Sequence, residues 1–88
     1  MSAPSTIVIE ILTKSECSLC DDMKKIVARV LSDYPAKLVI TDIEFDKTLY
    51  EKFKERIPIL KVNGMESFVY KTNETTLRHK LDRLKNEK

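Results

Sequence analysis

The sequence predicts a small α/β domain whose strands and helices follow one another in the order βαβαββα. Three observations support this prediction: a β-branched run at residues 7–12, a helical stripe of apolar residues from position 19, and an Asn-Gly dipeptide at 63–64 between two apolar runs. The 88 residues suffice for one hydrophobic core, so we expect one domain over residues 1–88. Helices packed on a sheet would give it three layers.

The first strand and the first helix have the clearest patterns. Residues 7–12 are apolar except for Glu10, which favours a strand covered on both faces. From Leu19 onward apolar residues recur at intervals of three and four, which is typical of one face of a helix. We expect this helix to end near Pro35, because a proline disfavours helical backbone in the residue before it.

The rest of the chain predicts a strand, a short helix, a hairpin and a last helix. A strand is expected at residues 38–43, and Asp46 can cap the short helix that follows it. The Asn-Gly dipeptide tolerates positive φ angles at both positions, which favours a two-residue type I′ turn in a hairpin over residues 59–70. Asn73 can cap the last helix, in which three leucines share one face.

Composition argues against several classes of partner. Sixteen basic and fourteen acidic side chains leave a formal net charge of +2, which gives no electrostatic reason to expect nucleic acid or an anionic membrane. The apolar runs are far shorter than the ~20 residues that cross a bilayer. The first residues also lack the basic and apolar regions of a secretory signal. We therefore expect a cytoplasmic protein that binds neither nucleic acid nor membrane.

The two cysteines of the chain, Cys17 and Cys20, stand three positions apart at the start of the first predicted helix. At this spacing the Cβ atoms come within about 5–6 Å, so a disulfide can form and open with small rotamer changes. In a reducing compartment such a pair is more often redox-active or metal-binding than structural. The helix start favours a thiolate, so we expect Cys17 to attack a disulfide and Cys20 to resolve the mixed disulfide.

Other roles are conceivable for the cysteines and for other polar residues of the chain. A zinc site normally has four Cys or His ligands, and the chain offers only two thiols and His79, so we expect no metal site. His79 falls on the face opposite the leucines of the last helix and should face solvent. Glu10 is expected to be partly exposed or hydrogen-bonded rather than a buried proton acceptor for Cys20. An inert buried pair of cysteines remains an alternative.

The C-x-x-C motif, the Ile57-Pro58 pair before the third strand and the βαβαββα order resemble the glutaredoxin branch of the thioredoxin fold over nearly the whole chain. Lys14 and the Cys17-Ser18-Leu19-Cys20 centre are most similar to small glutaredoxin-like proteins with a C-x-L-C centre. The resemblance implies a four-stranded mixed sheet in the order 2-1-3-4, flanked on both faces by three helices. It also implies a cis bond before Pro58 and a substrate-binding role for Lys14, Ile57 and Pro58, with the backbone of Ile57 facing an incoming peptide or glutathione.

The resemblance further implies a monomeric thiol–disulfide oxidoreductase of electron transport that reduces protein or small-molecule disulfides and holds no tightly bound cofactor. Glutathione or a thioredoxin-type reductase would be its reductant. Two alternatives stay open: an iron–sulfur cluster or metal carrier that shares its cargo between subunits through Cys17, and a non-catalytic interaction module. The glycine pair that follows the last strand in this family is replaced by residues 70–74, which contain no glycine and include Glu74. We therefore expect weak glutathione binding.

Overall fold

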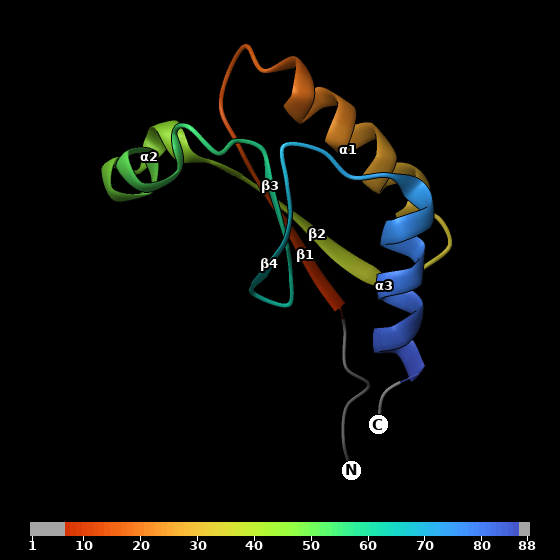
Figure 1. Ribbon diagram of the computed structural model, residues 1–88. Helices are drawn as coiled ribbons and strands as arrows, with labels where there is room; N and C mark the ends of the chain where they lie inside the picture. The colour runs from red at the N-terminus through yellow and green to blue at the C-terminus, as the bar shows by residue number, and fades with distance from the viewer. Residues whose placement is uncertain (1–6, 87–88) are drawn as a thin grey trace.

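A four-stranded sheet with the strand order β2-β1-β3-β4 forms the centre of the computed structural model, which describes residues 7–86 (Figure 1). β1 (Ile7–Thr13) runs parallel to β2 (Ala36–Asp42). β3 (Ile59–Val62) is antiparallel to both β1 and β4 (Met65–Val69). The mixed sheet and the strand order implied by the resemblance are therefore confirmed.

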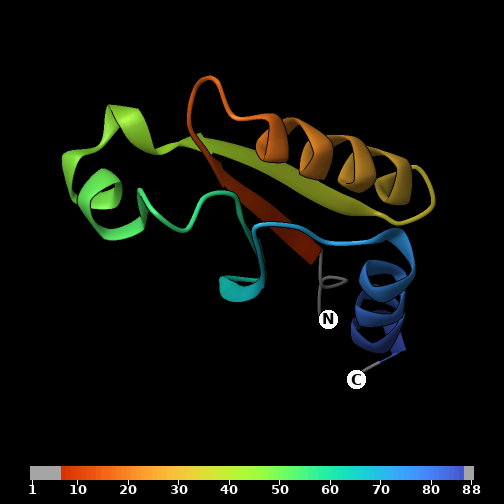
Figure 2. The same ribbon diagram turned by 45° about the horizontal axis from the view of Figure 1, so that its top comes forward.

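Three α-helices and one 3-10 turn complete the predicted order. The helices are α1 (Ser18–Leu31), α2 (Lys47–Phe53) and α3 (Glu74–Asn86), and the turn is η1 (Ile43–Phe45). In both views α2 and η1 lie beyond the carboxyl ends of β1 and β2, far from α3 (Figure 1 and Figure 2). No helix within the described residues is long and apolar enough to cross a membrane.

The larger of two apolar clusters packs α1 and α3 against one face of the sheet. The strand register places Ile9 and Ile11 beside Val62 and Leu60, so all four side chains point to this face. The helices supply the other half of the cluster. Its buried members are Ile7, Ile9, Ile11, Met23, Val27, Val30, Leu60, Val62, Leu77 and Leu81. Burial of this stripe fixes α1, and with it the start of the helix, relative to the sheet.

The smaller cluster lies at the carboxyl end of β1 and joins α2 to the sheet. Leu12 and Ile59 are partners across β1 and β3 and contribute its centre. Its buried members are Leu12, Cys20, Ile43, Phe53, Ile57 and Ile59. Cys20 is thus a core residue, and the first turn of α1 is packed against this cluster.

The predicted caps and turn are confirmed. Asp46 accepts a hydrogen bond from the amide of Leu49 at the start of α2, and Asn73 accepts one from the amide of Thr76 in α3. The β3–β4 turn has positive φ angles of 52° at Asn63 and 85° at Gly64, as a type I′ turn requires.

Three features differ from the sequence-based expectations: the burial of β1, the end of α1 and the end of β2. The start of β1 is not covered on both faces, because Val8 is 36% exposed and α2 lies at the other end of the strand. α1 ends at Leu31 rather than near Pro35, and the hydroxyl of Tyr34 instead donates a hydrogen bond to Asp82 of α3. Ile43 leaves β2 and becomes the first residue of η1, where its side chain is fully buried.

Candidate active site at the start of α1

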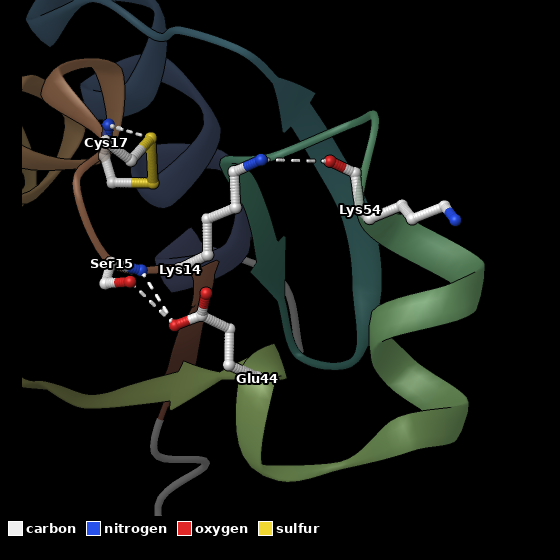
Figure 3. Close-up of a disulfide and its surroundings, with 6 residues drawn as sticks. Lys14, Ser15, Cys17, Glu44 and Lys54 are labelled. Atoms are coloured by element: carbon white, nitrogen blue, oxygen red, sulfur yellow. Dashed lines mark hydrogen bonds between the residues drawn. A yellow bond between two sulfur atoms is a disulfide. The ribbon is translucent and has the colours of Figure 1, made fainter.

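A disulfide joins Cys17 and Cys20, whose Cα atoms are 5.2 Å apart (Figure 3). Cys17 is the N-cap residue of α1, and its Sγ accepts a hydrogen bond from the amide of Cys20 at 3.1 Å. The sulfur of Cys17 therefore lies at the positive end of the helix dipole and accepts a hydrogen bond from a first-turn amide that has no acceptor within the helix. This arrangement stabilises negative charge on that sulfur when the disulfide is open.

The two cysteines differ in their exposure to solvent. Cys17 is partly exposed, whereas Cys20 is 1% exposed and belongs to the smaller apolar cluster. An external disulfide can therefore approach Cys17 but not Cys20. The difference follows from the helix, because the N-cap residue lies at the surface while the residue one turn later points toward the sheet.

The loop before Cys17 is held by Glu44 of η1. Its carboxylate Oε1 accepts hydrogen bonds from the amide of Ser15 at 3.2 Å and from the hydroxyl of Ser15 at 2.8 Å (Figure 3). Between this contact and Cys17, Glu16 has a φ of 54°, a left-handed conformation that is uncommon for residues other than glycine. The contact from Glu44 thus fixes a loop whose backbone would otherwise favour other conformations.

Lys14 is directed toward the end of α2. Its ammonium Nζ donates a hydrogen bond to the carbonyl of Lys54, the C-cap residue, at 3.4 Å (Figure 3). A cation there complements the partial negative charge of the helix end. Lys14 therefore links the end of β1 to α2, and a role for it toward substrate stays a prediction.

The structure places Ile57 in the apolar cluster that contains Cys20 and against which Cys17 packs. The peptide bond between Ile57 and Pro58 is cis. The carbonyl of Pro58 accepts a hydrogen bond from the amide of Tyr70 at 2.7 Å. Whether the backbone of Ile57 contacts substrate stays a prediction.

Tyr70 supports the segment around Pro58, a role that the sequence does not indicate. It directly follows β4, has a φ of 73°, and donates a hydrogen bond from its hydroxyl to the carbonyl of Glu55 at 2.9 Å. It therefore joins the end of β4 to the segment before Pro58. A tyrosine gives no sequence signal for a left-handed conformation, which normally favours glycine or asparagine.

A groove of about 390 Å³ lies between α1 and the segment that connects β4 to α3. The two segments run side by side in both views (Figure 1 and Figure 2). Its lining residues are Leu19, Asp22, Met23, Lys25, Ile26, Arg29, Lys71 and Thr72. One of its lining residues, Leu19, stands between the two cysteines in the sequence and is 45% exposed. The sequence does not indicate this groove, because its walls come from segments about half the chain apart.

The Glu74 carboxylate lies between two guanidinium groups. Arg78 donates to it at 2.9 Å, and Arg29 of α1 lies 3.5 Å away. The hydrogen bond from Arg78 is the main reason that the pKa of Glu74 is lowered from its ordinary value. Glu74 is thus ionised, but its charge is balanced by neighbours, which reduces its repulsion of an incoming carboxylate.

The remaining polar candidates have the structural surroundings expected of them. His79 is exposed on α3, and Glu10 accepts a hydrogen bond from the hydroxyl of Thr41 on the neighbouring strand. Among residues 7–86, no group of three or more His, Cys, Asp or Glu side chains is arranged to hold a metal ion.

Known proteins match this chain in sequence and in fold. The family described as "Glutaredoxin-like domain (DUF836)" matches residues 8–84. The X-ray structure of target protein XcR50 from X. campestris has a TM-score of 0.71 at 20% identity and covers 85% of this chain and 96% of its own. Thioredoxin-2 of a malaria parasite, described as part of its protein secretion machinery, has a TM-score of 0.68 at 16% identity over 93% of this chain and 86% of its own.

Mitochondrial thioredoxin 3 from Saccharomyces cerevisiae, in its oxidized form, has a TM-score of 0.66 at 13% identity over 90% of this chain and 79% of its own. At these identities the solved structures establish the thioredoxin-like α/β fold, and the family match extends over nearly all of the chain. The chain belongs to the glutaredoxin-like (DUF836) family of the thioredoxin fold, and its Cys17–Cys20 pair is the redox-active CxxC disulfide.

Proposed function

We propose that this protein is a dithiol thiol–disulfide oxidoreductase that reduces disulfides in proteins or small molecules. The observation that carries the proposal is the asymmetry of the CxxC pair. Cys17 caps α1 and is accessible, whereas Cys20 is buried one turn further on and bonded to Cys17. A family match and a CxxC disulfide are both consistent with this chemistry.

The proposed reaction has two exchange steps. The Cys17 thiolate attacks one sulfur of the substrate disulfide, whose S–S bond breaks and releases a thiolate that takes up a proton. Cys20 then loses its proton and attacks the sulfur of Cys17, which breaks the mixed disulfide and releases the second substrate thiol. The substrate gains two electrons and two protons, and the protein is left with the Cys17–Cys20 disulfide.

An external thiol must then return two electrons and two protons to the protein. Two molecules of glutathione or one dithiol reductase of the thioredoxin type would supply them, and no bound cofactor is needed for thiol exchange. Such a cycle requires a reducing compartment, which supports a cytoplasmic location. We further propose that the backbone of Ile57, whose side chain packs in the cluster of Cys20, binds a substrate held on Cys17.

The test is to trap the mixed disulfide. Cys20→Ser should leave the substrate attached to Cys17, so mass spectrometry of the variant after incubation with a disulfide-bearing peptide should find a covalent adduct at Cys17. Cys17→Ser should form no adduct and should have no reductase activity. Adduct formation through Cys20 in the Cys17→Ser variant, at the rate of the Cys20→Ser variant, would contradict the assigned roles.

A coloured protein that carries iron and sulfide after purification, with no turnover of any disulfide, would contradict oxidoreductase activity itself. It would favour a cluster carrier. A pair that stays reduced in mild oxidant would point to a non-catalytic module.

A further inference from the structure

We propose that the groove between α1 and residues 71–72 binds an extended acidic peptide segment of the substrate, on one side of the cysteine that reacts with Cys17. This inference rests on the proposed oxidoreductase function and specifies its substrate class. It follows from the chemistry of the groove walls and from the length of the groove.

The groove has an apolar floor and a cationic rim. Leu19, Met23 and Ile26 form one stripe of α1 at intervals of four and three residues, and Met23 is almost fully buried. Three cations, Lys25, Arg29 and Lys71, line the groove against a single acid, Asp22. An occupant that combines apolar and acidic side chains would complement both the floor and the rim.

Two of the three cations lack a partner of their own. Within residues 7–84, whose side chains are described, Lys25 and Lys71 make no ion pair. Arg29 has Glu74 at 3.5 Å, but its side chain is 66% exposed and so is still accessible to a ligand. The groove therefore has positive charge that no ion pair within the described side chains neutralises, and this charge attracts a negative ligand.

The length of the groove distinguishes a peptide from glutathione. A helix rises ~1.5 Å per residue, so the backbone at Lys25 and at Arg29 lies about 12 Å and about 18 Å along α1 from Cys17. Glutathione has one residue on either side of its cysteine and can occupy only the end near Leu19. An extended peptide advances about 3.3 Å per residue, so its fourth or fifth residue beyond the cysteine reaches Lys25.

The experiment uses disulfide-bearing peptides in which two glutamates stand four and five residues from the cysteine. One series places the glutamates before the cysteine and another after it, and matched peptides have glutamines or lysines there. Reduction by the unmodified protein should show a higher kcat/KM for one glutamate series than for its glutamine partner. The preference should weaken as salt is added, because exposed charges are screened.

Lys25→Glu tests the groove, and Lys24→Glu is its matched control. The two residues are neighbours on α1 and change the net charge equally, but only Lys25 lines the groove. Lys25→Glu should lower kcat/KM for the glutamate peptide by about three- to tenfold and raise it for the lysine peptide. Lys24→Glu should leave the preference between peptides unchanged. Circular dichroism checks that both variants fold.

Three results would overturn the inference. Equal kcat/KM for glutamate and glutamine peptides in both series would show that the groove does not distinguish charged from uncharged peptides. The proposed reductase function would be unaffected. Equal losses of kcat/KM for the glutamate peptide in Lys25→Glu and Lys24→Glu would show that any preference comes from the overall charge of the protein. A parallel loss of turnover with a glutathione mixed disulfide in Lys25→Glu would assign the groove to a small ligand. Failure to reduce any peptide, with no adduct in Cys20→Ser, would instead refute the proposed function.

Discussion

On one side of Cys17 the polar groups of Ser15 and Lys14 are hydrogen-bonded to other segments of the chain, whereas on the other side two lysines without ion pairs among the described side chains line a groove. On the first side, which we call the closed flank, Glu44 holds Ser15, Lys14 bonds to the carbonyl of Lys54, and Phe53 of α2 is buried. On the second side, the open flank, the groove begins at the exposed Leu19 and its rim is cationic.

The contrast separates the residues that position the sulfur from those available to a ligand. On the closed flank Glu44 and Lys14 already have partners, so a ligand that bound to either of them would have to break a hydrogen bond. Lys25 and Lys71 of the open flank have no such partner within the described side chains, so binding there breaks no ion pair of theirs. The exposure of Cys17 alone does not reveal this difference between the flanks. The hydrogen bonds and ion pairs of the residues on each flank do reveal it.

The largest effect is expected from Phe53→Ala on the closed flank. Phe53 is 3% exposed in the cluster that contains Cys20. The ammonium groups of Lys52 and Lys61 and the guanidinium group of Arg56 lie 5.4–5.9 Å from the centroid of its ring. Truncation of this side chain should lower the free energy of unfolding by about 3–5 kcal/mol, measured by urea denaturation.

Two further variants sharpen this first comparison. Phe53→Leu keeps much of the side-chain volume, so it should lower the free energy of unfolding less than Phe53→Ala. Leu19→Ala, on the open flank, should cost less than about 1 kcal/mol because the side chain is half-exposed. Equal losses for Phe53→Ala and Leu19→Ala would show that the two flanks do not differ in the way their packing indicates.

A smaller effect is expected from Glu44→Ala, which removes the acceptor that holds Ser15. Two hydrogen bonds to an exposed carboxylate would be lost, and the free energy of unfolding should fall by about 1 kcal/mol. The rate at which reduced Cys17 reacts with an alkylating reagent should change as the loop loosens. Glu44→Gln keeps an acceptor oxygen but removes the charge, so it should retain most of the stability. If Glu44→Gln lowered the free energy of unfolding as much as Glu44→Ala, the charge of Glu44 rather than its hydrogen bonds to Ser15 would be responsible for the loss.

Local patterns predicted the elements that hold the disulfide. The apolar run of β1, the stripe of α1 and the turn at Asn63 and Gly64 each depend on neighbours in the chain, and each is present in the structure. The cysteine spacing likewise predicted a disulfide at the helix start, because both residues belong to one turn. The order of strands came only from the family resemblance, since local patterns do not specify which strands pair.

Contacts between distant segments were not predictable in the same way. Lys14 meets Lys54 forty positions away, and its location depends on where α2 ends. Val8 is 36% exposed and α2 lies at the other end of β1, which the composition of the strand does not indicate. Glu74 was expected to present its charge to a ligand, but Arg29 and Arg78 lie beside it. The groove was missed for the same reason, since α1 and residues 71–72 meet only in the folded chain.

The smallest effect is expected from Glu74→Gln at the border of the open flank. The pKa of Glu74 is lowered from its ordinary value of 4.5, chiefly by the hydrogen bond from Arg78 and with help from Arg29. A carboxyl group with a lowered pKa in the folded state contributes stability above its unfolded pKa and loses it as pH falls through the folded pKa. The variant should therefore have a slightly lower Tm at neutral pH, and the difference should vanish in acid well below pH 4.5.

Thermal unfolding of the two proteins between neutral and acidic pH measures this difference, and added salt should reduce it because the groups are exposed. The same variant releases Arg29 from its acidic partner, so the open flank gains positive charge. Preference for a glutamate peptide over a glutamine peptide should then increase. A Tm difference that is independent of pH would show that these ion pairs do not stabilise the fold. An unchanged preference between peptides would show that Arg29 takes no part in recognition, leaving Lys25 and Lys71 as the groove's cations.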